Sequence, residues 1–104
     1  MNRIVRLMNE ICERPGQHLA RTDMGLLHAY VHGYLVGLGE DRNIYAELRI
    51  MERFEQFIHS EFLTSEIADG KSWSTLIRER ADSESDAFVA FRSLWARFLQ
   101  SQSA

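Results

Sequence analysis

Apolar residues recur at intervals of three and four along most of the chain, and this spacing places side chains on one face of an α-helix. Residues 2–14 follow the pattern until Pro15 and Gly16. These two residues end the first predicted helix, because the residue before a proline avoids the α region and glycine tolerates the turn that follows. The segment from His18 to Arg21 should then run extended.

A second helix is expected to begin near Thr22 or Asp23, whose side chains can accept hydrogen bonds from the free N–H groups of a first turn. It should run to Leu38, with Gly39 as its C-terminal cap. The segment is apolar on nearly all sides, which predicts the central, most buried helix of the fold. Its three glycines fall near one face, where another helix could approach closely: Gly25, Gly33 and Gly37.

Three more helices complete the prediction. One spans residues 42–62, a loop covers residues 64–71, and a short helix occupies residues 72–81. A capping box at residues 83–86 opens the last helix, which should end near residue 101 and leave a fraying tail. The inner face of the helix over residues 42–62 is assigned to its apolar residues, Ile44, Tyr45, Leu48, Met51, Phe54, Phe57, Ile58 and Phe62.

Length and composition agree with this pattern. The chain has 104 residues, of which 45% are hydrophobic, with one proline and six glycines. A domain of this size can bury a core without metals or disulfides, and frequent turns of the kind that β-folds require are lacking. The prediction is therefore one all-α domain over residues 1–104, a compact bundle of about five helices. Neither a signal peptide nor a membrane span is evident, so we expect a cytoplasmic protein.

Few residues suggest chemistry. Cys12 is the single cysteine and lies in an apolar helical stripe, which indicates a structural thiol. His28 and His32 are four residues apart and could share a helix face, but Ala29 stands where a zinc protease carries glutamate. No nucleophile elbow or glycine-rich phosphate loop is present. We therefore expect no catalytic residue, no metal and no cofactor, and half-buried helical roles for His28 and His32.

Charge is the most informative functional feature. The formal net charge is −3, which disfavours direct binding of nucleic acid, because phosphates require a basic surface. Residues 40–69 hold eight carboxylates and three arginines, a local charge of −5 that leaves +2 for the rest. One interpretation is that these carboxylates form a solvent-exposed helix face that binds nothing. The other is that they form a docking surface for a basic protein. The candidate contact residues are Glu40, Asp41, Glu47, Glu52, Glu55, Glu61 and Asp69.

Two segments resemble a known group of proteins. Arg14-Pro15-Gly16 follows the first helix, and Leu27-His28-Ala29-Tyr30-Val31-His32-Gly33-Tyr34 lies in the second. Together with an aromatic-rich last helix, they resemble small helical bacterial immunity proteins of contact-dependent growth inhibition and other polymorphic toxin systems. Gln17-His18 stands where that pattern carries Met-Tyr. The resemblance implies that the residues of these two segments stabilise the fold.

The resemblance also implies a function. Such a protein binds one cognate toxin domain, often a nuclease, in a one-to-one complex and neutralises it. Nuclease surfaces are basic because they hold phosphates, so the acidic residues named above would be the contacts. The alternative, from another class, is a structural or regulatory helical domain that self-associates through apolar helices.

Overall fold

A computed structural model describes residues 2–39, 44–64 and 70–103 of the chain. Within these ranges there are five α-helices and one turn of 3-10 helix, with no strand. The prediction of an all-helical fold with about five helices is therefore confirmed. The helices are α1 (Arg3–Glu13), α2 (Met24–Gly37), α3 (Ile44–Glu61), α5 (Trp73–Glu79) and α6 (Glu84–Ser103), and the 3-10 turn is η1 (Pro15–Gln17).

Short polar side chains start the helices where the sequence predicts. Asp23 accepts a hydrogen bond from the N–H three residues further on at 2.9 Å and caps α2. Ser72 does the same for α5 at 3.4 Å, and Ser83 for α6 at 3.1 Å. Each bond satisfies one of the N–H groups that a first turn leaves without an intrahelical partner.

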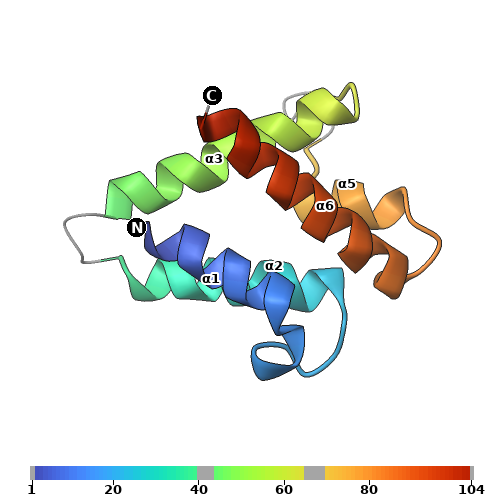
Figure 1. Ribbon diagram of the computed structural model, residues 1–104, viewed down its shortest axis with the longest axis horizontal. Helices are drawn as coiled ribbons and strands as arrows, with labels where there is room; N and C mark the ends of the chain where they lie inside the picture. Colours follow the sequence, from blue (N-terminus) through green and yellow to red (C-terminus); the bar gives the residue numbers. More distant parts are fainter. Residues whose placement is uncertain (1, 40–43, 65–69, 104) are drawn as a thin grey trace.

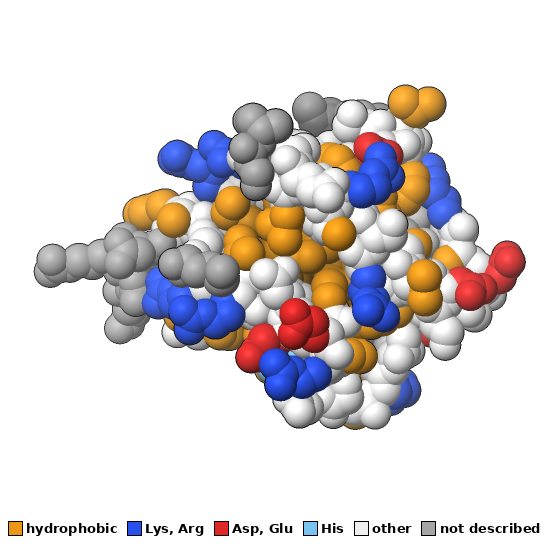
Figure 2. Space-filling view, in the orientation of Figure 1, with side chains coloured by type: hydrophobic (Ala, Val, Ile, Leu, Met, Phe, Trp, Pro, Cys, Tyr) orange, Lys and Arg blue, Asp and Glu red, His pale blue; other side chains and the backbone are white. Residues whose placement is uncertain are grey.

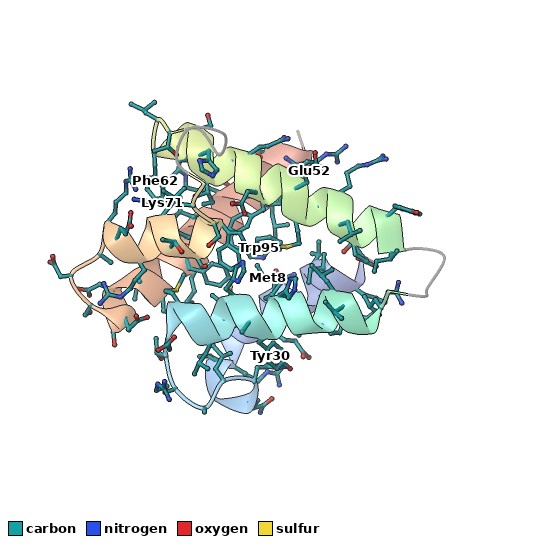
Figure 3. All side chains as sticks on the ribbon, turned by 180° about the vertical axis from the view of Figure 1, so that it is seen from behind. Met8, Tyr30, Glu52, Phe62, Lys71 and Trp95 are labelled. Carbon is teal, nitrogen blue, oxygen red and sulfur yellow. The ribbon has the colours of Figure 1, made fainter. Side chains whose placement is uncertain are left out.

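The helices form two layers. α1 and α6 lie on the side that faces the viewer in Figure 1, and α2, α3 and α5 lie behind them. The reverse view in Figure 3 brings α2 and α3 to the front, with α5 beside them. α3 packs against α1, α2, α5 and α6 and so contacts helices of both layers.

The core is built around an aromatic residue of α3. Phe54 is fully buried and lies edge-on to Trp95, Phe98 and Trp73, with ring centroids 5.1–5.3 Å apart. Phe91 adds a further edge contact at 6.3 Å. Such pairs contribute beyond the apolar area that they bury. The aromatic residues of α6 thus form its buried face.

α2 is less buried than its apolar sequence predicts. Its fully buried residues are Met24, Leu27 and Val31, and the opposite face is exposed. The prediction of a most buried helix is therefore wrong. The close helix approach predicted at its glycines is wrong too, because a Cβ atom added at Gly33 or Gly37 would meet nothing within 4 Å.

The inner face of α3 also differs from the prediction. Tyr45 is 75% exposed and Leu48 is 43% exposed, although both were assigned to the core. Glu47 takes the inner position at that end of the helix and continues the buried line through Met51 and Phe54. Apolar spacing alone could not identify this register, because the inward-facing residue in the first turn of α3 is a carboxylate, Glu47.

Two smaller predictions at chain ends and connections are corrected. The segment that was expected to run extended, residues 18–21, forms a turn and bends, and Leu19 N–H donates to the Pro15 carbonyl at 2.8 Å. The last helix ends at Ser103, two residues beyond the predicted end near residue 101. Within the described ranges, none of the helices has an apolar stretch long enough to cross a membrane.

Candidate protein-binding surface

The acidic residues expected to form one patch have separate environments. Glu47 is buried, with 3% of its surface exposed, so its predicted place on the outer face is wrong. Its carboxylate accepts hydrogen bonds from Arg3 Nε at 3.0 Å and from the backbone N–H groups of Arg3 and Ile4 at 3.4 and 3.2 Å. Glu47 therefore satisfies the N-terminus of α1, where a negative charge is favoured by the helix dipole.

Glu61 is neutralised by another helix. Arg97 of α6 donates to its carboxylate at 2.8 Å, so this charge is not free to attract a partner. Among the described residues, the arginines that pair with carboxylates of α3 come from α1 and α6. Apart from Glu52 and Glu55, the remaining candidates of that patch lie outside the described residues: Glu40, Asp41 and Asp69.

Glu52 and Glu55 are brought together at a hollow on the face formed by α2, α3 and α5. This cleft has a volume of about 560 Å³. Figure 3 views this face and labels Glu52 on α3 and Lys71 beside α5. Glu52 is exposed, whereas Glu55 is half-buried. The lining residues are His28, Met51, Glu52, Glu55, Gly70, Lys71 and Ser72.

The single cation of the cleft is already paired. Lys71 Nζ lies 3.0 Å from a carboxylate oxygen of Glu79, the last residue of α5. Glu52 has no ion-pair partner in the part of the chain that the structure describes. Its helical neighbours Arg49 and Arg53 are exposed but do not line the cleft. The cleft is therefore acidic, although its charge is smaller than the sequence count predicts.

The opposite wall of the cleft is an imidazole. His28 is half-buried, lies parallel to His32 at a centroid distance of 6.3 Å and contacts the Trp73 ring at 5.7 Å. Burial lowers the pKa of His28 below its ordinary value of 6.5, and the neighbouring His32 lowers the pKa further. Near neutral pH, the ring is therefore uncharged. The prediction that His28 and His32 share a helix face is confirmed.

A buried histidine of α3 fixes the rim of the cleft. His59 Nδ1 lies 2.7 Å from the Thr64 hydroxyl, and its Nε2 lies 3.1 Å from the Lys71 carbonyl oxygen and 3.7 Å from Glu55. It thus joins the end of α3 to the start of α5. The described residues contain no group of three histidine, cysteine or acidic side chains placed to hold a metal ion.

A second hollow lies on the other layer. Between α1 and α6, a groove of about 420 Å³ is lined by Cys12, Val89, Trp95, Ala96 and Leu99 together with a few polar residues. Figure 2 shows apolar side chains gathered in a band at the centre of this face. Burial raises the pKa of the Cys12 thiol to about 11, which agrees with the structural role predicted for it.

Two aromatic side chains, Trp73 and Tyr45, differ in exposure. Trp73 is 3% exposed and belongs to the core. Tyr45 stands on the surface at the start of α3, and Leu48 is exposed one turn further on. An exposed aromatic and an exposed aliphatic side chain therefore accompany the acidic cleft on the same helix.

Comparison with protein-family models, with curated proteins and with solved structures finds no significant match. The function must therefore be inferred from the geometry of the chain itself.

Proposed function

We propose that this chain is an immunity protein, which binds a cognate toxin domain and neutralises it, and that the cleft between α2, α3 and α5 is part of the contact surface. The observation that carries the proposal is the joint position of Glu52 and Glu55 in a cleft whose lysine is paired elsewhere. A recessed acidic site suits a basic protein partner, because charge complementarity favours encounter and orientation.

The surroundings of the cleft support a protein partner over a small molecule. Tyr45 and Leu48 expose apolar surface on α3, and exposed aromatic side chains supply much of the binding energy at interfaces. The exposed side of α2 ends in small residues, Gly33 and Gly37, against which another backbone could approach. The partner is a basic domain of the kind that holds phosphates, such as a nuclease.

The test uses the neighbouring gene, because an immunity gene is expected beside its toxin gene. The probe is the variable C-terminal domain of a large secreted protein encoded directly upstream. Its expression alone should arrest growth, and co-expression of this chain should restore growth. Purified together, the two should form a one-to-one complex. Continued arrest in the presence of folded immunity candidate would refute the proposal.

A second candidate function is favoured by the apolar groove on the other layer. Self-association through α1 and α6 could pair Glu13 on one wall with Arg92 on the opposite wall of a two-fold related copy. Light scattering over a range of concentrations separates the two proposals. A mass that stays at one chain throughout would remove self-association.

A further inference from the structure

The cleft combines three features that select among basic side chains. Two carboxylates, Glu52 and Glu55, lie three residues apart on α3, which places them near one another on the helix surface. The wall opposite is the His28 ring, backed by Trp73. A planar cation can hydrogen-bond to carboxylates while its face lies on an aromatic ring, whereas an ammonium group has no face to stack.

The charge state of the walls is compatible with a cation. His28 is neutral near pH 7, because burial and His32 lower its pKa, so its ring does not repel a positive group. Lys71 holds its ammonium 3.0 Å from Glu79 and is thereby compensated. The volume of about 560 Å³ admits a whole arginine side chain with part of its neighbouring backbone.

From this geometry we infer that the cleft receives the guanidinium group of an arginine side chain that the partner presents. Glu52 and Glu55 accept its N–H groups, and the His28 ring lies against its plane. The inference rests on the proposed function for the identity of the partner, and it deepens that function by naming the group that is recognised. The recognition site itself can be tested without the partner.

The probe is N-acetyl-arginine-N-methylamide, titrated into the folded protein and followed by NMR. The expected result is a saturable shift of the His28 ring and Trp73 indole signals together with the amides of residues 52–55. The matching lysine derivative should bind about threefold more weakly, because it lacks the planar face. Replacement by Glu52→Gln and Glu55→Gln together should weaken arginine binding about fivefold, as expected for exposed charge pairs.

The matched control is Asp82→Asn, which removes an exposed carboxylate outside the cleft and should leave arginine binding unchanged. Circular dichroism establishes that the variants are folded.

Three outcomes overturn the inference: no saturable shift at the cleft, equal binding of the arginine and lysine derivatives, or binding of the arginine derivative that is equal in the double variant and the wild type. If the toxin domain still binds in any of these cases, the proposed function stands and only the arginine site falls. If arginine binds and the toxin domain does not, the site stands and the proposed function falls.

Discussion

Replacement of Glu47 by alanine removes the buried carboxylate that links the start of α1 to the start of α3. Three hydrogen bonds end on this carboxylate, from Arg3 Nε and from two backbone N–H groups of α1. Glu47→Ala leaves these donors without their acceptor. Asn2 still caps α1, because its side-chain oxygen accepts from Ile4 N–H at 3.0 Å and from Val5 N–H at 3.3 Å.

The size of the loss follows from the exposure of the two partners. Breaking a buried ion pair by removal of one member costs about 3–5 kcal/mol. The side chain of Glu47 is 4% exposed, but that of Arg3 is 32% exposed and can recover water. The expected loss for Glu47→Ala is therefore reduced to about 2–3 kcal/mol. For a domain of this length, such a loss lowers the Tm by about 10 °C or more.

Urea denaturation followed by circular dichroism measures this loss. Glu47→Gln should lie between wild type and Glu47→Ala, because the amide keeps one acceptor but turns an N–H toward the donors of α1. Glu52→Ala is the matched control on the same helix, and since its side chain is exposed, it should change stability by less than about 0.5 kcal/mol. A Glu47→Ala variant as stable as this control would refute the assignment of Glu47 as an interior acceptor.

Three further predictions concern other parts of the molecule. Gly33→Ala should stabilise the fold by about 0.5–1 kcal/mol in thermal unfolding, because the new methyl meets nothing within 4 Å; a lower Tm would contradict this. Cys12, with its pKa raised to about 11, should react with iodoacetamide about tenfold faster per pH unit from pH 8 to 10 in mass spectrometry, and a plateau near pH 9 would contradict it. The pKa of His28 is lowered in the folded state, so the unfolded chain binds more protons than the folded chain as pH falls through 6.5. The free energy of unfolding should therefore be full above that pH and decline below it. His28→Gln should flatten this decline.

Much of the fold could be predicted from local patterns. Pro15 ends α1, and Asp23, Ser72 and Ser83 begin later helices, because helix caps depend on residues that are near in sequence. The aromatic residues that recur at three- and four-residue spacing in α6 are likewise the ones that it buries. These features are set within one or two turns, and so the sequence contains the whole signal.

The features that failed depend on pairing between distant segments. Glu47 is inside because α1, 43 residues earlier in the chain, supplies donors for it. Glu61 is neutralised by Arg97, which lies 36 residues away. A count of charges along the chain treats both as available for a partner. The cleft retains Glu52, which is exposed, and Glu55, which is half-buried beside His59, and its shape depends on how α2 and α5 pack against α3.

The most direct measurement is the affinity of the chain for the upstream-encoded toxin domain, wild type against Glu52→Lys with Glu55→Lys, over a series of salt concentrations. Our account predicts tight wild-type binding whose association rate falls as salt rises, and a large loss of affinity in the reversed variant. The same affinity for both proteins, at low and at high salt, would contradict a role for the acidic cleft in binding.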